Sequence, residues 1–303
     1  MKAIVASKYG GPEVLQLKVV ENPMPKDNEI LVKVRATTVT AGDIRMRSFN
    51  VPPLFWLPAR ISLGFTKPKQ PIFGMELAGI VEATGKAVTR FKAGDQVFAS
   101  TLAENFGGYA EYKCLPEDGL VFIKPQNMSY EEAAAVPVGA PTALRLLRKG
   151  KIQRGQNVLI YGASGSVGTY AVQIAKSFGA KVTAVCSTPN LELVKSLGAD
   201  RVIDYTKEDF AADGVQYDAI FDAVAKCSKS QAARALKPDG LFVTVAQLNT
   251  KQSRDEFTFV SKLIEVGKLR AVIDRCYPLD QIVEAHRYGD MGRKAGNVVI
   301  QVA

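Results

Sequence analysis

Residues 157–179 constrain the fold most, because they join a buried-strand pattern, a glycine-rich turn and an amphipathic helix in one run. The apolar run 158–161 predicts a short parallel strand covered on both faces, and apolar residues from Val167 to Phe178 recur at helical spacing. Gly162 and Gly165 let the intervening backbone bend and approach a ligand, while Gly168 lets the helix pack against the strand. This order predicts a site for a pyrophosphate at the helix N-terminus.

The motif in this turn is A-x-G-x-x-G, which begins at Ala163. Glycine-rich turns also serve as plain connections, but a strand, a turn and a helix in this order favour dinucleotide binding. The residues that we expect to contact the cofactor here are Gly162, Ala163, Ser164, Gly165, Ser166, Val167 and Gly168.

The bulk composition predicts a soluble protein of two domains. The chain has 303 residues, more than one hydrophobic core usually supports, and its 47% hydrophobic and 23% charged residues are ordinary for a globular protein. The N-terminus has no signal-peptide pattern and no apolar run long enough to cross a bilayer. Four widely spaced cysteines without a C-x-x-C pair favour reduced thiols, and we expect a cytoplasmic enzyme without an integral membrane segment.

The charge balance points to a phosphate-rich small molecule rather than to nucleic acid. Lys and Arg outnumber Asp and Glu by 39 to 30, a net charge of +9, which by itself suits nucleic acid or an anionic membrane. The basic residues are scattered, however, and no nucleic-acid-binding motif is present. A phosphate-bearing cofactor accounts for the charge, and weak membrane association stays open as an alternative.

The pattern of elements changes near residue 125. Before it, short alternating runs separated by Gly, Pro and Asp predict an antiparallel β-domain. After it, Ser129 and Glu132 form a helix-capping signature, and strands then alternate with helices as in a parallel α/β sheet. The strands expected in this second part are 181–186, 201–204, 217–222 and 241–245, and a further helix and the strand VVIQV end the chain.

At this point the chain resembles the zinc-free quinone oxidoreductase branch of the medium-chain dehydrogenase/reductases, which includes zeta-crystallin-like and 2-alkenal-reducing enzymes. The motifs that carry the resemblance, in family order, are FGMELAGIVEATG, FKAGDQV, GGYAEY, VGAPTA, YGASGSVG, SLGADRVIDY, LKPDG and PLDQIVEAHRY. The resemblance implies an α/β protein with a GroES-like β-barrel catalytic domain, residues 1–124 and 275–303. Inserted in it is a Rossmann domain with a doubly wound parallel sheet, residues 125–274, and the active site lies in the cleft.

The end of the second strand favours NADPH over NADH. An NAD-binding site needs a carboxylate there for the ribose 2′-hydroxyl, whereas this chain has Ser187, Thr188 and Asn190, which can bind a 2′-phosphate. Alternatively, Ser187 and Thr188 cap a helix. The family resemblance adds Tyr205 at the adenosine end. It also places Pro189 where relatives carry a basic residue, so the phosphate needs another base, such as Lys181 or Lys195.

A catalytic zinc requires three protein ligands, usually Cys and His. By resemblance, the positions of the Cys and His ligands in zinc alcohol dehydrogenases correspond to Thr40 and Met75. The single histidine, His286, fits a structural role in its helix, and Glu76 fits that of an acid in the barrel core. We therefore expect no metal.

Without a metal to polarise it, the hydride acceptor must already be activated, as a quinone or an α,β-unsaturated carbonyl is. By resemblance, Thr40 contacts substrate or nicotinamide. Its neighbours Asp43 and Arg45 complete the candidate catalytic set, with Arg45 as the donor to the developing oxyanion; alternatively, these two residues form a structural ion pair. Thr142 resembles a threonine that lies near the nicotinamide.

The remaining candidates concern the acceptor. The proline-rich segment 51–65 fits a loop over an apolar acceptor lined by Phe55 or Trp56, although a buried connection or a dimer contact fits as well. Tyr109 and Tyr112 fit barrel packing better than proton donation, and Cys114 is a weak candidate for a reactive thiol.

Two questions stay open. The segment 246–256 is shorter than the family's crossover and sixth strand, either through a deletion or because residues are missing, and it adjoins the sheet edge through which we expect a homodimer. The activity expected is NADPH-dependent reduction of a quinone or activated alkene. The alternatives are reduction of an enoyl thioester and a non-catalytic NADPH-binding sensor or structural protein.

Overall fold

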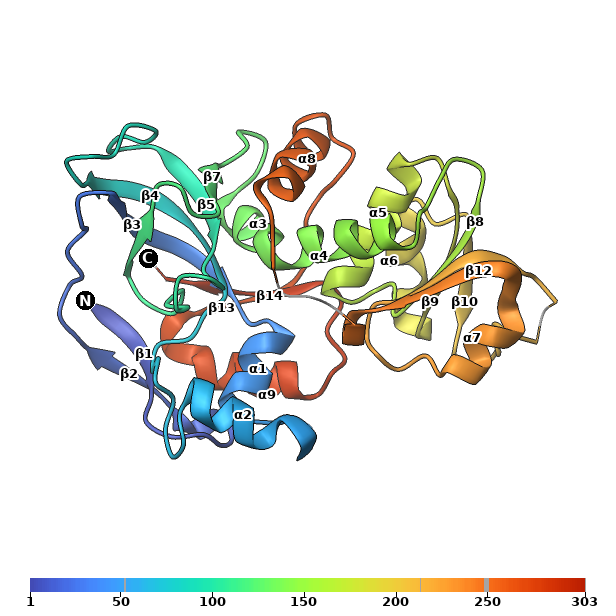
Figure 1. The fold of residues 1–303 in the computed structure, drawn as a ribbon, viewed down its shortest axis with the longest axis horizontal. Coiled ribbons are helices and arrows are strands. Elements are labelled where there is room, and N and C mark those ends of the chain that lie inside the picture. The colour runs from blue at the N-terminus through green and yellow to red at the C-terminus, as the bar shows by residue number, and fades with distance from the viewer. Residues whose placement is uncertain (52, 213, 248–250, 303) are drawn as a thin grey trace. The chain divides into compact units, whose positions relative to one another are not determined.

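The computed structural model describes residues 1–51, 53–212, 214–247 and 251–302. The chain forms two compact units, Met1–Val138 with Ile273–Ala303, and Gly139–Val272. The first unit extends past the boundary expected at residue 125, because α3 (Tyr130–Ala134) packs on strands of that unit. Each unit is described by itself (Figure 1).

The first unit contains the predicted antiparallel β-structure. Its alternating apolar residues point inward; in β3, for example, Ile30, Val32 and Val34 are fully buried. A two-stranded sheet joins β1 (Lys2–Ala6) to β2 (Leu15–Val19). A seven-stranded sheet has the order β13-β14-β3-β4-β5-β7, with β6 paired to β3. Its strands are β3 (Glu29–Thr38), β4 (Glu76–Thr84), β5 (Gln96–Ser100), β6 (Tyr112–Pro116), β7 (Val121–Ile123), β13 (Ile273–Pro278) and β14 (Asn297–Gln301).

Two helices of the first unit are joined by an ion pair between a buried arginine and an aspartate at the surface. Nη2 of Arg47, on α1 (Ala41–Ser48), lies 2.7 Å from the carboxylate of Asp290, at the end of α9 (Ile282–Asp290). Arg47 is 2% exposed, so this contact ties the start of the chain to its end. The other short elements of the unit are α2 (Pro53–Leu63), η1 (Pro12–Val14) and η4 (Leu279–Gln281).

The second unit is a five-stranded, wholly parallel sheet of order β10-β9-β8-β11-β12. This is the order of a Rossmann fold, in which the chain reverses direction across the sheet between β8 and β11 and leaves a ligand-binding position at their carboxyl ends. The strands are β8 (Asn157–Tyr161), β9 (Lys181–Cys186), β10 (Arg201–Asp204), β11 (Tyr217–Asp222) and β12 (Leu236–Thr244). The four strands predicted from the sequence are confirmed, although β12 begins earlier than expected.

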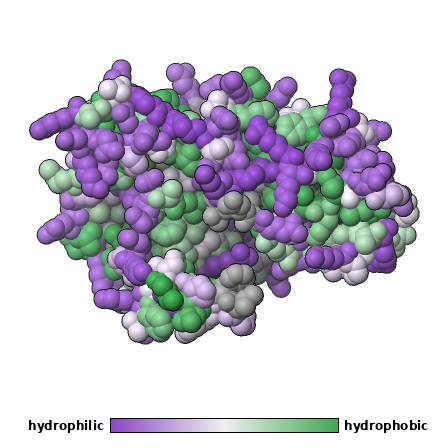
Figure 2. Space-filling model, in the orientation of Figure 1, coloured by the Kyte–Doolittle hydropathy of each residue, from purple (hydrophilic) through white to green (hydrophobic). Residues whose placement is uncertain are grey.

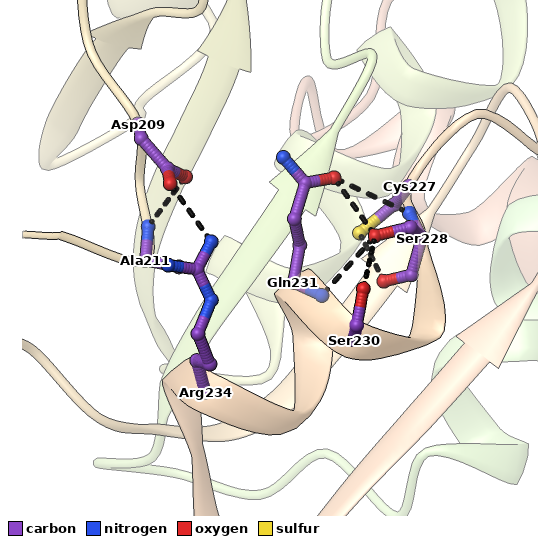
Figure 3. Close-up of polar contacts among 7 residues, drawn as sticks. All are labelled: Asp209, Ala211, Cys227, Ser228, Ser230, Gln231 and Arg234. Atoms are coloured by element: carbon purple, nitrogen blue, oxygen red, sulfur yellow. Dashed lines mark hydrogen bonds and ion pairs between the residues drawn. The ribbon is translucent and has the colours of Figure 1, made fainter.

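Two helices of this unit, α7 (Lys229–Ala235) and α8 (Arg254–Glu265), begin at side-chain capping boxes. At α7, Ser228 accepts from the backbone N–H of Gln231, and Gln231 accepts from that of Ser228. Arg234 then pairs with Asp209 at 2.9 Å, which ties α7 to the loop that follows β10 (Figure 3). The other helices are α4 (Val136–Lys149), α5 (Ser166–Ser177) and α6 (Leu191–Ser196), with 3₁₀ turns η2 (Thr188–Asn190) and η3 (Val245–Gln247).

After β12 the chain passes through η3 to α8, and the described residues contain no sixth strand of this sheet. Residues 248–250, in the short segment noted above, lie outside the described part. β12 therefore forms one edge of the sheet as described.

Candidate functional site

The glycine-rich turn lies at the carboxyl end of β8, at the position where a Rossmann sheet binds its ligand. The backbone N–H groups of Gly162 and Ala163 both donate to the carbonyl of Val185, at 3.0 Å, which holds the turn against the end of β9. Gly165 is the N-cap of α5 and has no side chain with which to cap it. The first turn of α5 is thereby left to bind an anion, because its N–H groups carry the positive end of the helix dipole.

The three glycines of this region have different structural roles. Gly162 has a φ of +74°, which favours glycine. A β-carbon on Gly168 would lie 2.2 Å from the carbonyl oxygen of Gly162, so helix and turn require glycine there in order to pack. A β-carbon on Gly165 would meet only the same carbonyl oxygen, at 3.5 Å. Nothing in the described protein fills this space, so the residues fit a group that comes close to the backbone at this point.

Three of the predicted cofactor residues lie together. The side-chain amide of Asn190 donates to the hydroxyl oxygens of Ser164, at 3.1 Å, and of Ser187, at 3.3 Å. These contacts join the glycine-rich turn to the carboxyl end of β9. The set carries hydroxyl and amide groups and no carboxylate.

Thr188 is engaged elsewhere. Its hydroxyl donates to the carboxylate of Asp204, at the end of β10, and Thr206 donates to the same carboxylate at 2.7 Å. Lys207 lies 3.8 Å from Asp204 and brings positive charge to this end of the sheet. The alternative in which Ser187 and Thr188 cap a helix is met only in part. Ser187 is the N-cap residue of η2, but its side chain makes no capping hydrogen bond.

The bases considered for the phosphate are not equivalent. Lys181 begins β9, five residues before Cys186, which is roughly 17 Å from the strand's carboxyl end at about 3.3 Å per residue. Lys195 is paired with Glu192 at 2.8 Å on α6. Tyr205 follows β10 with its ring 54% exposed, 6.4 Å from the ring of Tyr161. Lys207, rather than Lys181, thus carries positive charge beside the candidate residues.

Thr142 lies on α4, three residues after Gly139. A β-carbon on Gly139 would come 3.0 Å from the hydroxyl of Ser166, so α4 packs closely on the start of α5. Residues three apart share a helix face, and Thr142 therefore lies on the face of α4 that contains this contact.

Asp222, at the end of β11, organises the neighbouring loop and was not anticipated as a site residue. Its carboxylate accepts from the backbone N–H groups of Val224, Lys226 and Cys227. Val224 then packs on the turn, since a β-carbon on Gly162 would lie 2.6 Å from its methyl group. An acid at the end of the strand YDAIFD is the signal that sequence reasoning passed over.

In the first unit, Thr40 and Asp43 form the capping box that begins α1. The Thr40 hydroxyl donates to the Asp43 carboxylate at 2.6 Å and accepts from the Asp43 N–H at 3.0 Å. The other Asp43 oxygen accepts from the N–H of Gly74, at 3.0 Å. Asp43 is fully buried, so its carboxylate fixes the position of Thr40 from inside the fold.

Thr40 also lies 3.4 Å, oxygen to sulfur, from Met75. A β-carbon on Gly42 would meet that sulfur at 2.4 Å, so the first turn of α1 packs directly on the thioether. The two residues that the resemblance places at zinc-ligand positions therefore bring a hydroxyl and a thioether together. Among the described residues, no cluster of three His, Cys, Asp or Glu side chains is arranged to hold a metal ion.

Two buried carboxyl groups and one amine give this region unusual electrostatics. Burial raises the pKa of Asp43 to about 6 and that of Glu76 to about 7. Glu76 accepts from the hydroxyl of Thr38 and, at 2.7 Å, from the N–H of Val138. The ammonium of Lys294 donates to the carbonyl of Val39, and burial lowers its pKa against the attraction of Glu76 and Asp43. Sequence reasoning missed Lys294, which is 255 residues from Val39.

Arg45 is exposed on α1 and does not form the structural pair considered above. Among the ion pairs of the described residues, none joins it to Asp43. Arg45 belongs to α1, the helix that Thr40 caps. Its guanidinium has no carboxylate partner among the described residues.

The two tyrosines and the histidine behave as packing residues or lie at the margin of the site. Tyr109 is wholly buried, and its hydroxyl lies 3.2 Å from both the Thr38 carbonyl and Nε2 of His286. Burial lowers the pKa of His286 to about 3 and raises that of Tyr109 well above its usual range. Neither group is suited to proton transfer near neutral pH. Tyr112 is partly buried on β6.

Burial also raises the pKa of the Cys114 thiol to about 11. A thiol with this pKa is almost entirely protonated at neutral pH, and the thiolate is the reactive form. Cys114 is therefore not an activated nucleophile.

The acceptor candidates lie on a helix where we expected a loop. Pro53 begins α2, a position that proline tolerates, and Pro58 lies within it. Trp56 is 43% exposed and makes edge contacts with the rings of Phe49 and Phe65, at 6.3 Å each. The side chain of Phe55 lies outside the described part of the structure. None of the described helices has the length and hydropathy that a bilayer-spanning segment needs.

Comparisons with known proteins agree on both units. The family model described as alcohol dehydrogenase GroES-like domain matches residues 26–125, and models described as zinc-binding dehydrogenase match 166–272 and 246–300. The chain is 35% identical to the 2-methylene-furan-3-one reductase of Solanum lycopersicum, over 99% of this chain and 79% of that protein. It is 34% identical to the quinone oxidoreductase of Sus scrofa, over 94% and 93%. The solved quinone oxidoreductase of Coxiella burnetii matches with a TM-score of 0.84 and 27% identity, over 100% and 99%.

Proposed function

The chain belongs to the quinone oxidoreductase branch of the medium-chain dehydrogenase/reductases, and from this we propose that it is an NADPH-dependent, zinc-independent oxidoreductase that transfers hydride to a quinone or an α,β-unsaturated carbonyl. The observation that carries the proposal is the turn between β8 and α5, which Asn190 joins to the carboxylate-free end of β9. A curated relative that is 32% identical is named NADPH-dependent alkenal/one oxidoreductase, from Arabidopsis thaliana.

The second unit holds the cofactor. The pyrophosphate binds at the first turn of α5, in the space that Gly165 leaves open. Bound NADPH supplies the hydride that the acceptor takes up. Thr142, on the helix packed against the start of α5, contacts the nicotinamide end of the cofactor.

The adenosine 2′-phosphate binds Ser187 and Asn190, with Tyr205 beside the adenosine. Thr188 acts indirectly, since its hydroxyl is committed to Asp204. Lys207, 3.8 Å from that carboxylate, offsets its charge and supplies the base that Pro189 does not. This arrangement supports NADPH over NADH, because the chain places no carboxylate at the end of β9 to bind a free 2′-hydroxyl.

On the substrate side, Thr40 and Arg45 contact the acceptor and Asp43 positions them. Asp43 holds the start of α1 through Thr40 and Gly74, and Arg45 donates to the oxygen that gains negative charge. The hydroxyl of Thr40 and the sulfur of Met75 occupy the place of metal ligands, so a carbonyl here is activated by hydrogen bonds and by its own conjugation. Trp56 lines the apolar part of the acceptor site.

Two further features belong to the proposal. We place the enzyme in the cytoplasm, and we infer a homodimer formed along β12, the edge of the five-stranded sheet. An edge strand presents unpaired backbone groups to a second copy. Light scattering on the purified protein measures the oligomeric state, and a monomer would contradict the inferred dimer.

A substrate panel tests the proposed activity. Oxidation of NADPH and, in parallel, NADH is followed at equal concentration against quinones, 2-alkenals and enoyl thioesters. The proposal predicts turnover of quinones or 2-alkenals with NADPH preferred. Exclusive turnover of enoyl thioesters would give the protein a different acceptor class, and tight NADPH binding without any turnover would make it a sensor or structural protein.

A further inference from the structure

An exposed apolar surface lies on α2 and the turn that follows it. Fourteen large apolar side chains are exposed among the described residues, and four of them fall within residues 56–65. We call these four the α2 surface: Trp56, Leu57, Ile61 and Phe65, which are 43%, 54%, 62% and 59% exposed. Figure 2 shows hydrophobic side chains gathered on the surface where Figure 1 labels α2.

The apolar side chains of the α2 surface lie on one side of the helix. Leu57 is followed four residues later by Ile61, and residues at this spacing share a helix face. Phe65 joins them through an edge contact with Trp56. Single exposed apolar residues are common on protein surfaces, whereas a contiguous group of this kind marks an interaction site.

The α2 surface is held rigidly from beneath. The guanidinium of Arg60 lies 3.7 Å from the centre of the Phe49 ring and 5.0 Å from that of Trp56. It also donates to the carbonyl of Phe65 at 2.6 Å, and the hydroxyl of Tyr9 donates to the carbonyl of Leu63 at 2.9 Å. These contacts fix the helix and its following turn, so the exposed side chains form a preformed surface.

The charged residues in the segment that carries the α2 surface all have one sign, although Arg47 is buried and paired with Asp290. Residues 44–75 contain five Lys or Arg residues and no Asp or Glu. Lys67 and Lys69 are exposed, and the ammonium of Lys69 donates to the carbonyl of Ile61 at 2.7 Å, which places it directly beside the apolar residues. An exposed apolar face with Trp and adjacent lysines is the composition of helices that lie in a membrane interface.

We propose that the α2 surface docks on an anionic lipid bilayer, with Leu57, Ile61 and Phe65 entering the boundary between headgroups and acyl chains. Lys67 and Lys69 bind lipid phosphates, and Trp56 lies at headgroup depth, where amphipathic rings are favoured. A contact with a second copy through this face is disfavoured, because a symmetric interface brings the same basic segment of both chains together. The docking is peripheral and is tested apart from the reaction proposed above, in which Trp56 is also a candidate acceptor contact.

Sedimentation with vesicles tests the proposal. The full-length protein is mixed with vesicles of phosphatidylcholine alone or of equal parts phosphatidylcholine and phosphatidylserine. We expect binding to the anionic vesicles only, weakened by added salt. Trp56 is the single tryptophan, so its emission reports the α2 surface directly and is expected to shift to the blue on binding.

Two double variants separate the apolar and the basic contributions. Leu57→Gln with Ile61→Gln, and Lys67→Gln with Lys69→Gln, are each expected to weaken vesicle binding on the order of tenfold. Matched controls remove the same groups elsewhere: Met24→Gln with Val266→Gln, both exposed, and Lys18→Gln with Lys229→Gln, also exposed. All four are expected to keep the melting temperature and NADPH affinity of the parent.

Several results would overturn the proposal. The protein could fail to bind vesicles, or could bind both kinds of vesicle equally. The α2 variants could bind as well as their controls, or the emission of Trp56 could stay unchanged when vesicles are added. A dimer that dissociates only in the Leu57 and Ile61 variant would show that the face binds a second copy instead. None of these outcomes depends on whether a quinone or 2-alkenal is turned over.

Discussion

The hydroxyl oxygen of Thr40 lies 3.4 Å from the sulfur of Met75, and its proton is donated to Asp43. By the family resemblance, these two residues correspond to the positions where zinc alcohol dehydrogenases place a cysteine and a histidine. A hydroxyl and a thioether are not the thiolate, imidazole or carboxylate ligands that zinc selects. Here Thr40 caps α1 instead, and Met75 packs against the first turn of that helix.

Replacing Thr40 tests whether this cap also serves the reaction. Thr40→Val removes the hydroxyl, and we expect a loss of about 1 kcal/mol in stability from the missing cap. We also expect a fall in kcat/KM for the acceptor on the order of tenfold or more, because a polar contact to the reacting groups is lost. Thr40→Ser keeps the hydroxyl and is expected to keep both properties. Equal activity of the Val and Ser variants would assign Thr40 a purely structural role.

The glycines of the turn make a matched pair. Gly168→Ala forces a β-carbon to 2.2 Å from the Gly162 carbonyl, and we expect a loss of about 1–3 kcal/mol in stability. Gly165→Ser meets no such clash and supplies a capping hydroxyl, so stability is expected to hold or rise by up to about 1 kcal/mol. Its side chain fills the ligand space, however, and NADPH affinity is expected to fall roughly tenfold, or about 1.4 kcal/mol. Urea unfolding and NADPH titration measure the two effects, and unchanged affinity in Gly165→Ser would place the cofactor elsewhere.

His286 offers a test of the buried core of the first unit. It is the single histidine, so its ring resonances need no assignment. Burial lowers its pKa from 6.5 to about 3. The folded protein is thus expected to show a neutral ring from about pH 8 to about pH 5 by NMR. Below pH 6.5 the imidazole of His286 takes up a proton in the unfolded state but not in the folded state. The free energy of unfolding therefore decreases as the pH falls from about 6.5 toward about 3. A folded-state midpoint near 6.5 would contradict the buried position.

Glu76 has the opposite dependence on pH. Burial raises its pKa from 4.5 to about 7, so between these values the folded state holds a proton that the unfolded state has released. The free energy of unfolding of the parent, relative to Glu76→Gln, is therefore expected to be constant below about pH 4, to fall between pH 4.5 and about 7, and to level off above. Glu21→Gln, at an exposed position, is the control. A difference between parent and Glu76→Gln that does not change with pH would show that folding does not raise the pKa of Glu76.

The sequence predicted the second unit well because its signals are local. Strand, turn and helix at 157–179 are contiguous, and Gly168 is required by a contact only six residues away, with Gly162. In the first unit, Ser129 and Glu132 predict the start of α3 by the same kind of local spacing.

The contacts that were missed join distant residues. Lys294 reaches Val39 across 255 positions and Arg47 reaches Asp290 across 243, and no local spacing reports such pairs. Segment 51–65, which contains α2, was expected as a loop because proline disfavours helices. The stacking of Arg60 on Phe49 and Trp56 supplies tertiary contacts that hold α2 as a helix.

The central claim is hydride transfer from NADPH to an activated acceptor without a metal, and label transfer tests it most directly. The protein is treated with a strong chelator, and a 2-alkenal is reduced with NADPH carrying deuterium at nicotinamide C4, with each face labelled in turn. The account predicts undiminished turnover and one deuterium on the β-carbon of the product from one of the two labelled cofactors. Loss of turnover that zinc restores, or a product without deuterium from either cofactor, would contradict it.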